Sequence, residues 1–256
     1  TNFMMNRFLA AFRKCSLLAG IFVSYNLAIA SGLQVSPISL SLQARENASG
    51  LTLSNTGDKL VHAQVRVYQW FQDDKGDQLT PSRGLLASPP MIELKPGEKQ
   101  LIRIIRAKAP PKGTAAVEDT YRLLINEIPV KSEAPQNGLA FTLSYSLPVF
   151  VKPVGISETT PKLNWTSSLT SDGKYLHLSI KNNGNGHAQL ADLKLMDSTG
   201  KFNDLHPGLL GYVLPGAIMH WKVKMPASTS TFGGKIKVMI NGTQSVQDII
   251  LDTPSY

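Results

Sequence analysis

The sequence predicts an all-β protein built from two β-sandwich domains, and three observations support this. From Ser31 onward the chain is a series of short segments in which apolar and polar residues alternate, separated by Gly, Pro, Asn and Asp, as is typical of sandwiches and barrels. No segment has the apolar spacing of an amphipathic helix of ordinary length. The chain has 256 residues, 42% hydrophobic and 17% charged, which is sufficient for two domains that each bury a core.

The predicted strands follow one another along the chain. Residues 33–42 (LQVSPISLSL) are expected to form a first strand at a sheet edge, because Pro37 is tolerated only at an edge. The segment Asp73–Asp77 predicts a hairpin turn; it lacks the terminal glutamate and the ligand number of a calcium loop. The other clear strands are residues 50–55, 61–70, 99–106, 120–128, 174–182 and 235–241.

Two pairs of segments resemble each other. Residues 51–67 and 176–195 both run from a strand through a Gly/Asn turn into His-Ala-Gln, and residues 94–104 resemble 213–223. The separation is about 120 residues each time, which favours duplication of one domain, although short turn-strand similarities also arise from shared physics. Pro and Gly near residues 152–155 predict a short connector, so we expect one domain at 31–153 and another at 154–256.

Residues 1–30 have the three parts of a secretory signal peptide. Arg7, Arg13 and Lys14 precede an apolar run that ends in Ala28-Ile29-Ala30, so cleavage is expected before Ser31. A membrane anchor is the alternative, but the run is short for a spanning helix. The only cysteine, Cys15, lies in this segment. A processed protein without disulfides, and without a membrane span, fits the periplasm of a bacterium.

The charge and the motifs argue against several functions. The formal net charge is +8 and falls to +5 without residues 1–30, which hold three basic residues and no acid. This mild excess includes no basic run typical of nucleic-acid binding. The sequence has no nucleophile, zinc-protease or phosphate-loop motif, and its five histidines lack ligand spacing. We therefore predict no enzyme, no metal and no cofactor, and a binding function by default.

One strand has an unusually apolar face. In GLAFTLSYSL (138–147) the side chains of Leu139, Phe141, Leu143, Tyr145 and Leu147 all point one way. Such a face either packs in the protein's own core or is lent to another protein, and the alternation alone leaves both open.

Three further segments resemble a known family. LLASPPMIELKPGEKQLIRIIR (85–106), YRLLINEIP (121–129) and VFVKP (149–153) are similar, in order and spacing, to the N-terminal domain of periplasmic pilus chaperones of the chaperone-usher pathway, the PapD-like superfamily. The departures resemble its archaic, Csu-type branch. The resemblance covers residues 33–155 well and the remainder in outline.

The resemblance implies a fold, a function and partners. The fold would be two immunoglobulin-like domains in a boomerang arrangement. The function would be to bind, fold and cap pilus subunits by donor-strand complementation and to deliver them to an outer-membrane usher, without nucleotide. The alternative is a secreted β-sandwich adhesin or a pilus subunit. Self-association of the free protein is left open.

The resemblance also implies site residues. Leu139, Phe141, Leu143 and Tyr145 would be the donor residues, and Val35, Ile38 and Leu40 would belong to an edge strand that pairs with the subunit. The better-known branch binds the subunit's terminal carboxylate with an Arg and a Lys. Those positions fall here at Ile38 or Ser39 and at Pro148, so the candidate anchors are Arg103, Arg106 and Arg122 on neighbouring strands.

Overall fold

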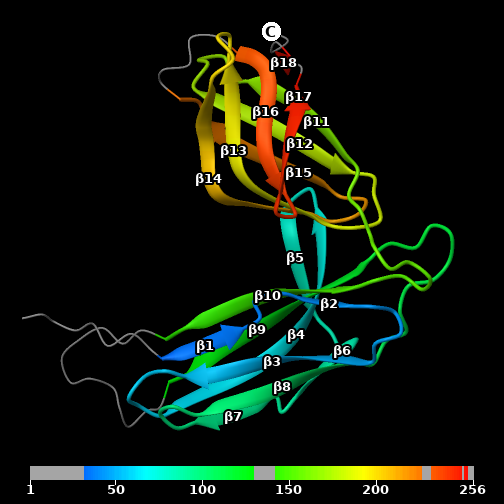
Figure 1. Cartoon of the computed structure of the whole chain (residues 1–256), viewed down its shortest axis with the longest axis vertical. Helices are drawn as coiled ribbons and strands as arrows, with labels where there is room; N and C mark the ends of the chain where they lie inside the picture. Colours follow the sequence, from blue (N-terminus) through cyan, green and yellow to red (C-terminus); the bar gives the residue numbers. More distant parts are fainter. Residues whose placement is uncertain (1–31, 130–141, 227–231, 250, 253–256) are drawn as a thin grey trace, which may run out of the picture. The chain divides into compact units, whose positions relative to one another are not determined.

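The strands of the chain form four sheets, which make two sandwiches (Figure 1). The computed structural model describes residues 32–129, 142–226, 232–249 and 251–252. For residues 232, 233, 251 and 252 it describes the backbone only. Within these residues every regular element is a strand. The all-β class predicted from the sequence is therefore confirmed.

The first sandwich contains one antiparallel sheet and one mixed sheet. One has the order β1 (Leu33–Ser36), β3 (Ala48–Asn55), β8 (Lys99–Arg106) and β6 (Leu85–Ser88). The other has the order β2 (Leu40–Leu42), β10 (Ser144–Val151), β9 (Asp119–Ile128), β4 (Val61–Asp73) and β5 (Gly76–Pro81), and β7 (Met91–Leu94) also pairs with β4. The hairpin predicted at Asp73–Asp77 is present between β4 and β5.

The second sandwich contains two sheets of four strands each. The first has the order β15 (Ile218–Lys224), β12 (Tyr175–Asn182), β11 (Leu163–Leu169) and β18 (Leu251–Asp252). The second has the order β14 (Phe202–Val213), β13 (Ala188–Asp197), β16 (Phe232–Ile240) and β17 (Thr243–Asp248). The change from one sandwich to the other falls between Val151 and Leu163, and the domain boundary near residue 153 remains a prediction.

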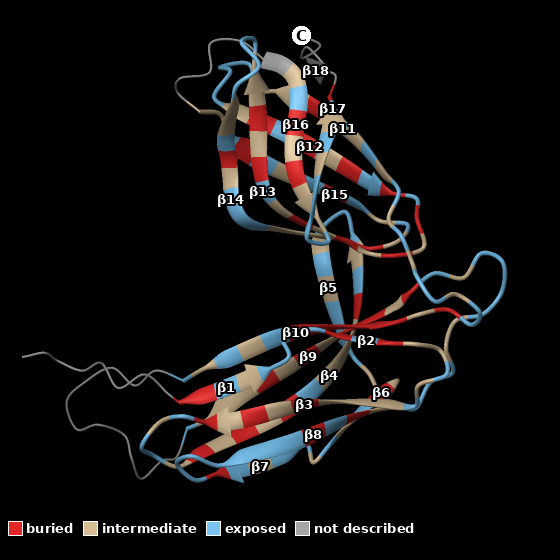
Figure 2. Ribbon diagram, viewed as in Figure 1, coloured by how far each residue is buried: buried red, intermediate tan, exposed pale blue. Residues whose placement is uncertain are grey.

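Each sandwich buries its own apolar core between its two sheets (Figure 2). Alternate residues of β3, β8 and β12 are buried, because successive side chains of a strand point to opposite faces. Leu51 and Leu53 are buried from β3, and Ile102 and Ile104 from β8. The alternation that identified these segments in the sequence is therefore the packing of the core.

The prediction of one strand over residues 33–42 is wrong. The segment forms two strands, β1 and β2, which belong to different sheets of the first sandwich. β1 pairs antiparallel with β3, and β2 pairs parallel with β10. Pro37 lies between them and has no N–H to donate to a ladder, so the pairing of β1 stops there and the chain crosses to the other sheet.

The internal repeat has a counterpart in buried hydrogen bonds. Asn55 and Asn182 are 1% and 0% exposed. The side-chain amide of each donates to the carbonyl of the residue four positions later and to a second carbonyl on a strand of the opposite sheet. The side-chain oxygen accepts from the N–H two residues later, that of Gly57 or Gly184, at 3.0 and 2.9 Å. The two sandwiches thus build the same turn in the same way, which supports duplication.

Candidate functional site

β10 is paired along its whole length on one side and only at its end on the other. Its register with β9 runs from Ser144↔Asn126 to Val151↔Asp119. Its register with β2 covers only Val149 to Val151. From Ser144 to Pro148, the second side of β10 therefore has no strand among the described residues. An unpaired edge of this kind presents backbone N–H and C=O groups that another chain can pair with.

β1 supplies a second edge nearby. It is the terminal strand of its sheet and pairs only with β3 among the described strands. The Tyr145 hydroxyl on β10 donates a hydrogen bond to the Leu33 carbonyl on β1 at 2.6 Å. This bond ties the two strands together across the two sheets. The first sandwich therefore has two strand edges held close to each other.

The apolar face of β10 continues the pattern predicted for residues 138–147. Leu147 is 5% exposed and belongs to the core of the first sandwich. Leu143 and Tyr145 are half-buried and pack against that core. Leu139 and Phe141 lie outside the described residues. Along this face Leu147 is buried, whereas Tyr145 and Leu143 are half-buried. The same side of the strand therefore packs in the protein's own core at Leu147 and has partly exposed apolar side chains, as a strand lent to another protein needs, at the other two positions.

The three residues predicted for the edge strand lie in different environments. Val35 is on β1 and packs against the core, whereas Leu40 is on β2 and is 6% exposed. Ile38 lies between the two strands and is 73% exposed. Only Ile38 is thus a freely accessible apolar side chain.

Of the three candidate arginines, only Arg122 lies beside β10. Its Nε and Nη2 atoms donate to the side chain and the carbonyl of Ser146, each at 3.0 Å. Its guanidinium also lies over the ring of Trp70, with the carbon 4.7 Å from the ring centre. Burial lowers the pKa of the Arg122 guanidinium, but an arginine remains protonated in proteins. A fixed positive charge therefore lies at the unpaired part of β10.

The other two arginines are placed elsewhere. Arg106 donates to the carbonyls of Ala44, Glu46 and Lys108, so its guanidinium holds loops of the first sandwich. Arg103 is exposed on β8, which belongs to the other sheet.

An aromatic cluster next to Arg122 was not predicted from the sequence. Trp70, Phe150 and Leu214 form a small buried cluster of their own, and Tyr212 packs against it. The rings of Trp70 and Tyr212 meet edge to face at 5.2 Å. Every pair of these residues that joins the two sandwiches is separated by at least 62 positions in the sequence. The local alternation of apolar and polar residues therefore does not identify the cluster.

A buried carboxylate is the other unpredicted feature. Glu118, with its side chain 2% exposed, accepts hydrogen bonds from His187 Nδ1 at 2.8 Å, from the His187 N–H at 2.9 Å, and from the Thr159 hydroxyl. Burial opposes ionisation of this carboxyl, but the bonds and charge of His187 and the bond of Thr159 outweigh it, so the pKa of Glu118 is lowered. The His187 ring stacks on Phe150 with centroids 3.5 Å apart. His187 is thus engaged on two sides.

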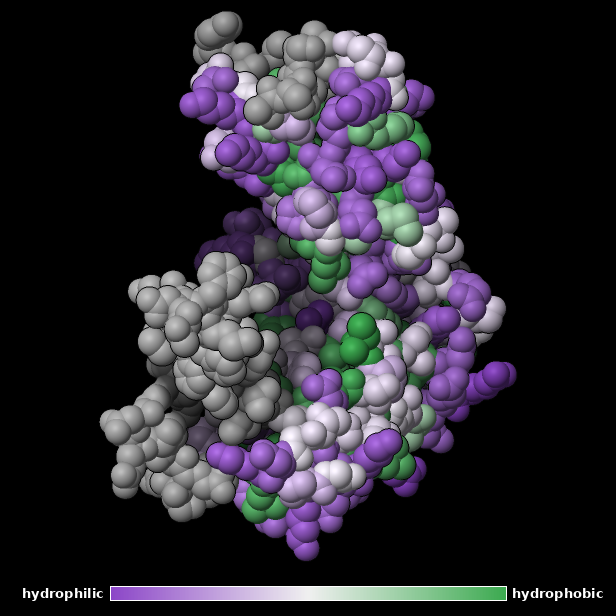
Figure 3. Space-filling model, turned by 60° about the vertical axis from the view of Figure 1, so that its left-hand side comes forward, coloured by the Kyte–Doolittle hydropathy of each residue, from purple (hydrophilic) through white to green (hydrophobic). Residues whose placement is uncertain are grey.

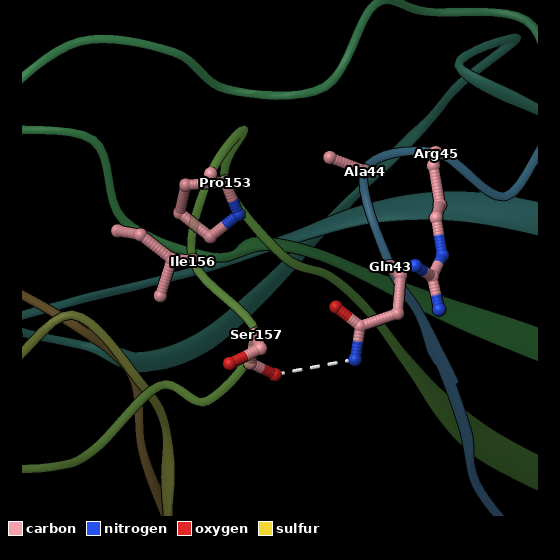
Figure 4. Close-up of a pocket in the computed structure, with 7 residues that line it drawn as sticks. Gln43, Ala44, Arg45, Pro153, Ile156 and Ser157 are labelled. Carbon is pink, nitrogen blue, oxygen red and sulfur yellow. Dashed lines mark hydrogen bonds between the residues drawn. The ribbon is translucent and has the colours of Figure 1, made fainter.

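One pocket lies where β2 ends and is lined by Gln43, Ala44, Arg45, Pro153, Gly155, Ile156 and Ser157 (Figure 4). Gln43 Nε2 donates to the Ser157 carbonyl at 3.2 Å across it. The described residues contain no group of three or more His, Cys, Asp or Glu side chains placed to hold a metal ion. They also contain no helix that is long and apolar enough to cross a membrane.

Comparison with known proteins gives the family. Residues 32–157 match the family described as pili and flagellar-assembly chaperone, PapD N-terminal domain. A chain of the CsuC–CsuE chaperone–tip adhesion subunit complex, from archaic chaperone-usher Csu pili of Acinetobacter baumannii, has 26% identity and a TM-score of 0.62 over 86% of this chain and 99% of that one. Residues 32–157 belong to the PapD-like pilus chaperones, and the chain resembles such a chaperone structure over 86% of its length. Comparison with curated proteins found no match.

More distant PapD-like structures share the fold. A chain of the Salmonella enterica SafA pilin–SafB chaperone complex has 18% identity and a TM-score of 0.59, over 86% of this chain and 97% of that one. The E. coli chaperone DraB has 18% identity and a TM-score of 0.55, over 84% of this chain and 95% of that one. The members of this family are chaperones and not enzymes, in agreement with the prediction from the sequence that this protein is not an enzyme.

The resemblance leads us to expect the carboxylate anchor of the better-known branch at Ile38 or Ser39 and at Pro148, and none of these residues is basic. Ile38 and Ser39 line a pocket with Phe150, His187, Gln189, Tyr212 and Asn241, a set that contains no Lys or Arg. Pro148, at the other of these positions, is buried. The cation nearest to the unpaired part of β10, among the three candidates, is Arg122.

Proposed function

We propose that this pilus chaperone acts in the periplasm by lending β10 to an incomplete pilus subunit. The observation that carries the proposal is the unpaired side of β10 at Ser144–Pro148, combined with an apolar face that continues toward residues 139–141. Donor-strand complementation needs both features, because backbone groups must pair with the subunit's edges while large side chains fill its groove. The edge of β1 would pair with the subunit as well.

The donor side chains supply the affinity. Each large apolar side chain that becomes fully buried contributes about 1.5–3 kcal/mol. Leu143 and Tyr145 are already half-buried in the free protein. Their further burial against a subunit therefore contributes less free energy than the full burial of a large apolar side chain at position 139 or 141 would. We therefore expect the outer residues of the strand to dominate the capture of a subunit.

Arg122 is our candidate for the terminal carboxylate of the subunit. It is held in place by Ser146 and Trp70, so little side-chain freedom would be lost on binding. A carboxylate beside a fixed guanidinium forms a charge-assisted hydrogen bond, about twice as strong as a neutral one. Arg103 and Arg106 are weaker candidates, because one lies on the other sheet and the second already binds three carbonyls.

Delivery to an usher needs a surface that stays accessible while β10 is occupied. Leu101 on β8 and Leu86 on β6 are 56% and 45% exposed on the outer face of the other sheet, and Arg103 lies between them. The space-filling view shows how small groups of hydrophobic residues interrupt a largely hydrophilic surface (Figure 3). Exposed apolar residues of this kind often mark protein contacts, and we place the usher contact on this face.

Co-purification with a pilus subunit tests the donor strand. The native protein should yield a soluble complex, whereas Phe141→Asp and Leu143→Asp should yield little or none. Val246→Asp is the matched control, because Val246 is an exposed valine on β17 of the second sandwich. Thermal unfolding of each free variant shows that it is folded. Equal recovery of the subunit with all variants would refute the donor strand and favour the alternative, an adhesin or pilus subunit.

A further inference from the structure

The outward side chains of two neighbouring strands of the second sandwich, β12 and β15, are all basic or uncharged. On β12 and β15 the inward residues, such as Leu176, Leu178 and Val223, are buried in the second core. The outward residues are therefore set by the alternation of the two strands. They are Tyr175, His177, Ser179 and Lys181 on β12, and Ile218, His220, Lys222 and Lys224 on β15.

The cross-strand partners on this face do not neutralise one another. Lys222 lies opposite His177, and Lys224 lies opposite Tyr175. The outward residues of β11 are Asn164, Thr166 and Ser168. Asp252, on β18 at the other edge of the sheet, is in register with Ser168. Asp172 is nearby in the chain, but it lies in the turn before β12 and accepts bonds from Thr170 and the Lys174 N–H.

The other sheet of the same sandwich is built differently. Lys194 lies opposite Asp204 and Lys235 lies opposite Asp248, and both form ion pairs, at 3.8 and 3.5 Å. Opposite charges across strands are stabilising, whereas like charges are destabilising. This sheet therefore neutralises two of its lysines, while its Lys237 lies opposite Lys194 and Val246. None of the lysines of β12 and β15 has an acid opposite it.

Protection of a sheet edge explains only part of this arrangement. Lysines on an edge strand prevent pairing with other chains, and β15 is the terminal strand of its sheet, with Lys222 and Lys224 on it. Lys181 and His177, however, lie on β12, which has strands on both sides. Edge protection does not require cations there.

We propose that this face binds the surface of an anionic phospholipid membrane. The side chains stand roughly perpendicular to the sheet, so the cations are spread over a plane instead of converging on one point, as a single bound anion would need. A planar array of headgroup phosphates matches such a plane. Ile218, 44% exposed and opposite Lys181, adds an apolar contact at one end.

A protein partner fits this face less well. Protein interfaces have an apolar core, and lysine is depleted in them. The outward residues of β12 and β15 include one exposed large aliphatic side chain, Ile218, at the margin. Lysine is instead the common residue of surfaces that bind anionic lipids, where each one strengthens binding about fivefold.

Vesicle co-sedimentation tests the proposal with three proteins. These are the native chain, the face variant Lys181→Gln/Lys222→Gln/Lys224→Gln, and a control variant Lys194→Gln/Lys235→Gln/Lys237→Gln on the other sheet. The two variants have the same net charge and the same N-terminal segment, so any effect of total charge or of that segment is equal in both. All substituted lysines lie on strand faces away from the core, so both variants should fold.

The native chain should bind vesicles of mixed phosphatidylcholine and phosphatidylglycerol, and added salt should weaken the binding. The face variant should bind on the order of 100-fold more weakly, and the control should bind nearly as well as the native chain. Equal weakening in the two variants, binding to pure phosphatidylcholine, or no binding by the native chain would overturn the proposal. Binding to soluble polyglutamate but not to vesicles would also overturn it and favour an acidic protein.

Discussion

The contact of Glu118 with His187 permits a quantitative test of how the buried carboxylate stabilises this chaperone. Glu118→Ala removes the acceptor of three hydrogen bonds and leaves the His187 N–H and Thr159 hydroxyl without it. A buried donor that loses its acceptor costs about 1–3 kcal/mol. Because two such donors remain while the His187 side chain is 23% exposed and water can reach it, we expect a total loss of about 3 kcal/mol.

The duplication provides a matched control. His62 is the residue equivalent to His187 in the repeated His-Ala-Gln segment, and it pairs with Glu93 at 3.8 Å. The side chains of His62 and Glu93 are 33% and 55% exposed. An exposed pair contributes about 0–1 kcal/mol, so Glu93→Ala should cost less than about 1 kcal/mol. Urea unfolding followed by tryptophan fluorescence measures both.

The pH dependence gives a second readout for Glu118. Its pKa is lowered in the folded protein from an ordinary value of 4.5. The ionised carboxylate therefore stabilises the fold fully above that value, and the stabilisation is lost as the pH falls through the lower, folded pKa. The difference between the native protein and Glu118→Ala should be constant near neutral pH and shrink below about pH 4.5. A loss no larger than that of Glu93→Ala, or a difference that grows in acid, would refute this account.

Four further substitutions test the packing of the sandwiches. Asn55→Ala and Asn182→Ala each remove the donor to two carbonyls and should each lower the unfolding free energy by about 2–3 kcal/mol. A large difference between the two losses would contradict the equivalence of the two asparagines. Tyr145→Phe loses one hydrogen bond, to β1, and should cost about 1 kcal/mol while hydrogen exchange in β1 accelerates; unchanged exchange would show that β1 is held otherwise. Gly84→Ala would place a methyl group against the ring and hydroxyl of Tyr121, which is 1% exposed, and should lower the melting temperature through a cost of about 1–3 kcal/mol; an unchanged melting temperature would contradict the close contact.

Most strands could be predicted because their signal is local. Residues 99–106 were predicted as a strand and form β8 with the same limits, and the segment at 120–128 differs from β9 by one residue. Alternation fixes which side chains are buried without knowledge of the partner strand. The error at residues 33–42 arose because alternation continues through Pro37, while the change of sheet depends on what lies beside the chain.

The candidate site was predictable only in part. The apolar face that includes Leu143 and Tyr145 follows from alternation, and its use as a donor follows from resemblance to the pilus chaperones. The choice of Arg122 over Arg103 and Arg106 required the sheet order, because all three are arginines on or at the end of strands with similar local sequence. Neither the pairing of Glu118 with His187 nor that of Arg122 with Trp70 has a local signal.

The sequence by itself determined the all-β class, the turns, the apolar face of the strand at 138–147 and the family. These depend on side-chain direction and turn chemistry within a few residues. Only the tertiary structure decided that one side of β10 is unpaired at Ser144–Pro148 among the described residues, that Tyr145 joins β10 to β1, and that the lysines of β12 and β15 have no acid opposite them. Each of these is a contact, or a missing partner, between strands far apart in the chain, and strand order and register are set by the packing of the whole sandwich.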